Sequence, residues 1–194
     1  PEAVSKTIDG RIGGEDVLDN IFGLGSTDLF SKVERIQIVA CGTSLHAGRV
    51  AANWLSSIAE LPCQIDYASE YRYRNPHVDK NSLLITISQS GETADTLAAL
   101  REAKSKGATV LGVVNVVGST IARETDAGVY LHTGPEIGVA STKAFTGQVT
   151  VLTMMAIQLA LYRETITAKK ADEAHALFYP LTRKNYLVLR SYLS

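Results

Sequence analysis

The fold is decided by a short apolar segment that becomes polar at its end, residues 83–93, with the sequence LLITISQSGET. Its first half has the length and composition of a buried strand, and a helical pattern follows directly. The first N–H groups of a helix lack partners within the helix, and the helix dipole adds positive charge there. This position is surrounded by three hydroxyl donors and one amide: Ser88, Gln89, Ser90 and Thr93. The stretch therefore predicts a phosphate-binding turn that needs no lysine.

Strand and helix patterns alternate along the chain on both sides of this stretch. Apolar strands are expected at five places: residues 36–42, 63–68, 82–88, 109–115 and 127–131. Most of these strands are nearly continuous in apolar residues, which is typical of a parallel sheet covered on both faces. The pattern therefore predicts an α/β domain with a parallel sheet.

A second hydroxyl-rich turn follows the strand expected at residues 36–42. Thr43 and Ser44 come directly after the glycine that ends this strand, and either residue suits the N-cap of the next helix. Ligands of parallel α/β sheets bind beyond the carboxyl ends of the strands. Because both hydroxyl turns fall at such ends, one site could use both.

Other reactive side chains give weaker signals. Glu92 and Glu136 lie beside serine turns and could act as acid or base, although we interpret Glu92 as stabilising the N-terminus of its own helix. Lys143 lies in a first helical turn, where a cation is unfavourable, and this hints at a role. Cys41 has no histidine partner in a recognised pattern and is interpreted as a small buried residue. Glycine motifs for dinucleotides and for P-loops are absent from the sequence.

The composition is that of an ordinary soluble globular protein, with 45% hydrophobic and 20% charged residues and a net charge of −1. This charge gives no reason to expect nucleic acid or an anionic membrane as a partner. Cys41 and Cys63 have neither metal nor disulfide spacing, which favours reduced thiols and a cytoplasmic protein. The apolar stretch near residues 149–161 is interrupted by polar residues and is predicted to fall short of a membrane span. No metal and no cofactor are expected.

The sequence divides into three parts. Residues 1–34 are interpreted as an N-terminal arm or linker with a short helical stripe at 17–22, residues 35–163 as the main domain, and residues 164–194 as a helical tail. Helices are possible at 168–178 and 186–192 in this tail. The helix after Ser141 is apolar on several sides, and we expect it to contact a second domain or subunit.

Three motifs together resemble one family. They are CGTS at residues 41–44, SQSGETADT at 88–96 and EIGVASTKAF at 136–145. In order and spacing they resemble the sugar isomerase (SIS) domain family. The third motif is similar, more narrowly, to the isomerase half of the glutamine–fructose-6-phosphate aminotransferases, and the resemblance is to the first SIS domain of that half.

This resemblance implies a three-layer α-β-α sandwich with a five-stranded parallel sheet of flavodoxin-like type. It also implies two groups of substrate-binding residues. The sugar phosphate would be held by Ser88, Gln89, Ser90 and Thr93. The sugar hydroxyls would face Thr43, Ser44, Val139, Ala140 and Ser141.

The family's enzymes are homodimers with a glutaminase domain followed by two SIS domains. Ammonia from glutamine aminates fructose 6-phosphate, and isomerisation gives glucosamine 6-phosphate, which starts amino-sugar synthesis toward UDP-N-acetylglucosamine. The family's proton-transfer and Schiff-base residues lie in the second SIS domain and the tail, so the resemblance implies a fragment that binds without turnover and carries no catalytic residue. The alternatives are a non-catalytic SIS module that senses a phosphosugar and a flavodoxin-like FMN binder.

Overall fold

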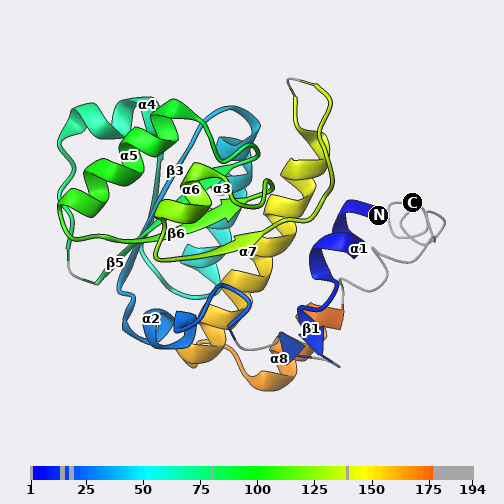
Figure 1. Ribbon diagram of the computed structural model, residues 1–194. Helices are drawn as coiled ribbons and strands as arrows, with labels where there is room; N and C mark the ends of the chain where they lie inside the picture. The colour runs from blue at the N-terminus through cyan, green and yellow to red at the C-terminus, as the bar shows by residue number, and fades with distance from the viewer. Residues whose placement is uncertain (1, 14–15, 18–19, 80, 139, 177–194) are drawn as a thin grey trace.

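The computed structural model describes residues 2–13, 16–17, 20–79, 81–138 and 140–176 (Figure 1). Its centre is a five-stranded sheet in the order β4-β3-β5-β6-β7, and all four pairings are parallel. The strands are β3 (Arg35–Ala40), β4 (Cys63–Tyr67), β5 (Ser82–Ser88), β6 (Thr109–Val114) and β7 (Ala127–Tyr130). All five predicted strands are confirmed; the ends of β5 match the prediction, and the ends of the other four differ by at most two residues.

Helices cover both faces of the sheet, so the three-layer sandwich is confirmed (Figure 1). Ile36 and Ile38 of β3 belong to one hydrophobic core and Val39 to the other, because successive side chains of a strand point to opposite faces. The first face carries α3 (Gly42–Ser57) and α7 (Thr142–Tyr162), with α1 (Glu2–Ile8), α2 (Ser26–Lys32) and α8 (Ala168–Ala176) packed against α7. The second face carries α4 (Ala68–Tyr71), η1 (Arg72–Arg74), α5 (Ala94–Ser105) and α6 (Thr120–Glu124).

The N-terminal segment differs from its prediction. The helical stripe expected at residues 17–22 is wrong for the residues of it that the structure describes, because Val17 ends β2 (Asp16–Val17) and residues 20–22 form a turn. β2 pairs antiparallel with β1 (Ile12–Gly13). Phe22, an apolar residue of this stripe, is buried from a turn and not from a helix. Phe22 is fully buried and packs on Phe30 of α2 with ring centroids 5.4 Å apart. This segment is therefore part of the same hydrophobic core as the sheet.

Helix α7 is apolar on several sides because this chain itself surrounds it. Its contacts are with α1, α2, α3 and α8, so our expectation of a second domain or subunit is not needed to explain its composition. Helix α7 is long and apolar enough to cross a membrane by length and composition only, with 21 residues and a mean hydropathy of 1.5 over 18 of them. Of that window, 72% is buried inside the domain, which accounts for its apolar character. The helix expected at 186–192 lies outside the described residues.

Candidate functional site

The turn that follows β5, residues 88–93 (hereafter turn 88–93), is closed by its own hydroxyls. Ser88 is buried, and its Oγ accepts the Gly91 N–H at 3.0 Å and lies 2.9 Å from Thr93 Oγ1. Ser90 Oγ accepts the Glu92 N–H at 3.2 Å. The Ser88–Thr93 hydrogen bond uses one of two hydroxyl protons, so one proton of this pair remains available to an incoming anion.

Gly91 places turn 88–93 directly against the start of α6. Its φ is +67°, and a Cβ at this position would lie 2.0 Å from the Oγ of the buried Ser119. Gly91 O accepts the Ile121 N–H at 3.0 Å, and Gln89 O accepts the Asn115 N–H at 3.2 Å. The backbone N–H groups of Asn115 and Ile121 therefore hold the turn in place, and its hydroxyls lie at the end of β5.

The carboxylate of Glu92 does not stabilise the helix to which we assigned it. Its Oε1 accepts the backbone N–H of Thr120 at 2.7 Å, at the first residue of α6. This hydrogen bond, with a smaller contribution from Arg123, holds the pKa of the Glu92 carboxyl below its usual value. Glu92 thus binds a helix N-terminus, as interpreted, but the helix is α6 and not the one that follows Glu92 in the sequence. A carboxylate committed in this way is poorly placed as an acid or base for a ligand at the turn.

Two long helices begin at this edge without a side-chain cap. Helix α5 has Thr93 as its N-cap and α3 has Cys41, and neither makes a capping side-chain bond. The prediction that Thr43 or Ser44 is the N-cap of α3 is wrong, since both lie inside its first turn. The pairing of Ala40 with Ile87 in the neighbouring strands β3 and β5 brings the two N-termini to one place. The strand order reverses here, which is where open α/β sheets bind ligands.

Ser44 has a partner that the local sequence does not reveal. Its buried Oγ accepts a hydrogen bond of 2.9 Å from Nε2 of Gln148, which lies 104 residues later in α7. Gln148 is fully buried. Its only signal in the sequence is a polar residue within a largely apolar helix, and this signal does not identify the partner.

The third predicted motif leads into α7. Glu136 Oε2 accepts the Ala144 N–H at 3.0 Å, and the Lys143 ammonium donates to the Pro135 carbonyl at 2.7 Å. A carboxylate thus neutralises the N-terminus of α7, and a carbonyl binds the cation of Lys143, which is unfavourable at a helix N-terminus. Ala140 and Ser141 stand at the start of α7, and Val139 lies outside the described residues.

The predicted residues are therefore brought together in part. Turn 88–93 is adjacent to the turn of residues 41–44 (hereafter turn 41–44), because the strands that precede them are neighbours in the sheet. The segment at Ala140 and Ser141 is connected to them through Gln148 of the same helix. We call the sheet edge at the carboxyl ends of the strands the carboxyl edge, and the opposite edge the amino edge.

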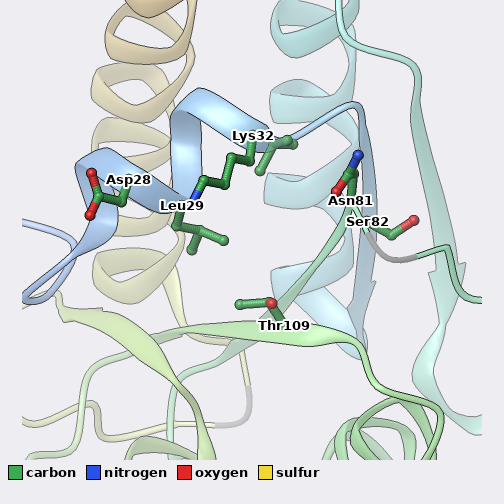
Figure 2. A pocket seen from close by; sticks show the side chains of 7 residues that line it. Asp28, Leu29, Lys32, Asn81, Ser82 and Thr109 are labelled. Carbon is green, nitrogen blue, oxygen red and sulfur yellow. The ribbon is translucent and has the colours of Figure 1, made fainter.

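A hollow lined by residues of α2, β5 and β6 lies at the amino edge, away from both turns (Figure 2). It has a volume of about 230 Å³ and lies between α2 and the first residues of β5 and β6. Another, of about 330 Å³, lies at the carboxyl edge between α1, residues 133–135 and the start of α7. Neither includes turn 88–93. We place the site by its chemistry, since a turn that offers hydroxyls and helix amides binds an anion without a deep cavity. The described residues contain no cluster suited to a metal ion.

Comparison with known proteins shows the family of this chain and agrees with its fold. A family model of the SIS domain matches residues 29–158. The chain belongs to the SIS domain family. It is 50% identical over 178 residues to glutamine–fructose-6-phosphate aminotransferase [isomerizing] from Idiomarina loihiensis, which covers 91% of this chain and 29% of that protein. This SIS domain therefore spans less than a third of the relative's length.

Solved structures agree as well. The C-terminal domain of glucosamine-fructose-6-phosphate aminotransferase from Francisella tularensis superposes with a TM-score of 0.90 at 39% identity, over 94% of this chain and 51% of that one. A putative sugar binding protein from Salmonella typhimurium superposes with a TM-score of 0.73 at 19% identity, over 93% of this chain and 55% of that one. The second likeness shows the shared fold alone.

Proposed function

We propose that this SIS domain binds a hexose 6-phosphate, with the phosphate at turn 88–93 and the sugar toward turn 41–44. The observation that carries the proposal is the geometry of turn 88–93. Three hydroxyls and the uncapped N-terminus of α5 meet at the carboxyl end of β5, where the strand order reverses. Gln89 of the same turn, Thr43 and Ser44 of turn 41–44, and Val139, Ala140 and Ser141 before α7 complete the proposed set.

We further propose that the domain is the first SIS domain of a glutamine–fructose-6-phosphate aminotransferase. Its ligands are then fructose 6-phosphate and glucosamine 6-phosphate, and its partners are a glutaminase domain, a second SIS domain and a second copy of the enzyme in the cytoplasm. The identity of about 50% to enzymes of that name supports this assignment, as does the coverage of 51% of the Francisella domain. The EIGVASTK motif supports the first of the two domains.

The site supports binding without turnover. Proton transfer needs a titratable group that is free to reach the substrate. Three titratable side chains that the structure describes beside the motifs are already engaged: Glu92 with the start of α6, Glu136 with the start of α7, and Lys143 with Pro135. They hold the binding elements in place, and we assign no catalytic residue to this chain.

Calorimetric titration with glucosamine 6-phosphate tests the proposal, with glucosamine and inorganic phosphate titrated separately. We expect tight binding to require both the sugar and the phosphate, and to be lost in Ser88→Ala/Ser90→Ala. Ser105→Ala is the matched control, because this exposed serine lies at the far end of α5 and, among the described residues, its hydroxyl donates to the Glu102 carbonyl alone. Absence of binding by the unmodified chain contradicts the proposal, and conversion of fructose 6-phosphate by this chain alone contradicts the lack of turnover.

A further inference from the structure

We propose that Gln148 is a positioning residue for the sugar, acting through the hydroxyl of Ser44. This inference rests on the proposed function, because it assigns a determinant to the sugar side of the same site. The bond from Gln148 Nε2 to Ser44 Oγ is 2.9 Å long and joins two side chains that are at least nine-tenths buried. It is a direct side-chain bond between α7 and the first turn of α3.

The direction of this bond determines what Ser44 offers to a ligand. A hydroxyl has one proton and two lone pairs. Since the Gln148 amide donates to Ser44 Oγ, the Ser44 proton remains free to be donated elsewhere. The first turn of α3 faces the carboxyl edge beside turn 88–93. Gln148 therefore fixes Ser44 as a donor at this edge, which suits a sugar oxygen that needs a proton donor.

The packing of α7 keeps Gln148 in one place. Its neighbour Gly147 is so close to the end of β7 that an added Cβ would lie 2.5 Å from Thr133 Cγ2 and 3.1 Å from Thr7 Oγ1. Thr133 is in turn held by Asn115, whose Oδ1 accepts its N–H and lies 3.0 Å from its hydroxyl. The start of α7 is thus wedged against residues that follow β6 and β7. A shift of Gln148 relative to Ser44 would require this whole contact to move.

Core packing alone does not explain an amide at this position. Oε1 of Gln148 is buried, and no hydrogen-bond partner for it lies among the described residues. An unsatisfied buried carbonyl costs free energy, and an apolar side chain of the same shape would avoid that cost. The contribution of the amide is its bond to Ser44.

The same helix provides a matched control. Gln158 is also buried, its Oε1 also lacks a partner among the described residues, and its Nε2 lies 3.3 Å from the Tyr162 hydroxyl. Ten residues of helix place it about 15 Å from Gln148, toward the amino edge. Gln148→Met and Gln158→Met thus remove the same group from the same helix, and only the first removes it from the proposed site.

The experiment is calorimetric titration of the unmodified chain and both variants with glucosamine 6-phosphate and, separately, with inorganic phosphate. We expect Gln148→Met to weaken glucosamine 6-phosphate binding roughly tenfold, about the value of one hydrogen bond, and to leave phosphate binding unchanged. Gln158→Met should bind both ligands as the unmodified chain does, even if it lowers the free energy of unfolding as much as Gln148→Met does. Gln148→Asn, whose side chain is one methylene shorter and too short for Ser44, should reproduce the loss if the Met variant does not fold.

A double-mutant cycle with Ser44 distinguishes a positioning role of Gln148 from a general loss of structure. In the Ser44→Ala background, Gln148→Met should weaken glucosamine 6-phosphate binding no further, because the hydroxyl through which Gln148 acts is already gone. Three outcomes would overturn this inference and leave the proposed function standing. Gln148→Met could bind glucosamine 6-phosphate as tightly as the unmodified chain, its effect could add to that of Ser44→Ala, or it could weaken the binding of inorganic phosphate equally. Failure of the unmodified chain to bind glucosamine 6-phosphate overturns the proposed function, and this inference with it.

Discussion

The two hydroxyl turns at the carboxyl edge occupy equivalent places after neighbouring strands, yet they are held in different ways. Turn 88–93 closes on its own Ser88 hydroxyl and is fixed from behind by backbone at the start of α6. Turn 41–44 has no such internal closure among its described bonds, and Ser44 is held by Gln148 from 104 residues away. The phosphate side of the site is thus built locally, whereas the sugar side depends on how α7 packs on α3.

This difference predicts different effects for substitutions in the two turns. Changes in turn 88–93 should act on local geometry and on phosphate affinity together. Changes at turn 41–44 should leave phosphate affinity intact and affect the sugar. Glycines with positive φ occur in both turns and give the most direct comparison, because only one of them lacks space for a side chain.

The largest effect is expected for Gly91→Ala. Its φ of +67° is unfavourable for alanine, and the new methyl would lie 2.0 Å from Ser119 Oγ. Strain and overlap together should cost about 3 kcal/mol of unfolding free energy and abolish phosphate binding. Gly42→Ala has a similar φ of +57° but no atom within 4 Å of the new methyl, so it should cost only about 1 kcal/mol. Urea unfolding and phosphate titration measure both quantities.

A second substitution tests the cause. In Gly91→Ala/Ser119→Gly the overlapping side chain is gone, so the double variant should recover the part of the loss that exceeds Gly42→Ala. Equal losses for the two single glycine variants, with no recovery in the double variant, would show that contact with α6 does not constrain turn 88–93.

The parts of the fold that depend on local pattern could be predicted from the sequence. The five strands are recognisable from their hydrophobic periodicity and composition, and the serine turn from the position of its hydroxyls directly after a strand. The stripe at residues 17–22 misled because Phe22 is buried by a turn and not by a helix. Spacing alone cannot distinguish these two causes of burial in so short a segment.

The second expected effect separates the two serines of turn 88–93. Ser88→Ala leaves the buried Gly91 N–H without its acceptor, so it should cost about 2 kcal/mol of unfolding free energy. Ser90→Ala frees the N–H of the exposed Glu92 to water and should cost less than about 0.5 kcal/mol. Both variants should weaken glucosamine 6-phosphate binding, since both remove a hydroxyl from the proposed phosphate site.

Thermal unfolding beside calorimetric titration separates stability from affinity in this pair. A Ser90→Ala protein that binds as the unmodified chain does would restrict the phosphate site to Ser88, Gln89 and Thr93. Equal stability of the two variants would contradict the central place of the Ser88 hydroxyl in the turn.

Contacts between distant segments explain what the sequence could not reveal at the site. Ser88, Ser90 and Thr93 were recognisable because their spacing is local. Gln148 and Ser44 meet only after α7 has packed on α3, and no local pattern encodes that pairing. The sequence predicts the Glu92 carboxylate at its own helix because that helix is adjacent in sequence, whereas the folded chain brings the Thr120 N–H of α6 to 2.7 Å from it.

The smallest effect concerns this carboxylate and its dependence on pH. The pKa of Glu92 is lowered from 4.5 in the folded protein by the Thr120 N–H. A lowered folded pKa means that the bond contributes stability above about pH 4.5, and that this contribution is lost as the pH falls through the folded pKa. Glu92→Gln should therefore be less stable than the unmodified chain at pH 7, with a difference that shrinks toward pH 3. Urea midpoints across this range measure it.

Glu34→Gln, at an exposed position of the amino edge, is the control for general charge effects in the same titration. Its difference from the unmodified chain should not follow the pH dependence of the Glu92 variant. If Glu92 instead acted on the ligand as an acid or base, Glu92→Gln would change ligand affinity at pH 7 while leaving the unfolding curves superimposed. A parallel, modest loss of stability and phosphate affinity is what a support of turn 88–93 should produce, and the sugar selectivity set at turn 41–44 should stay unchanged.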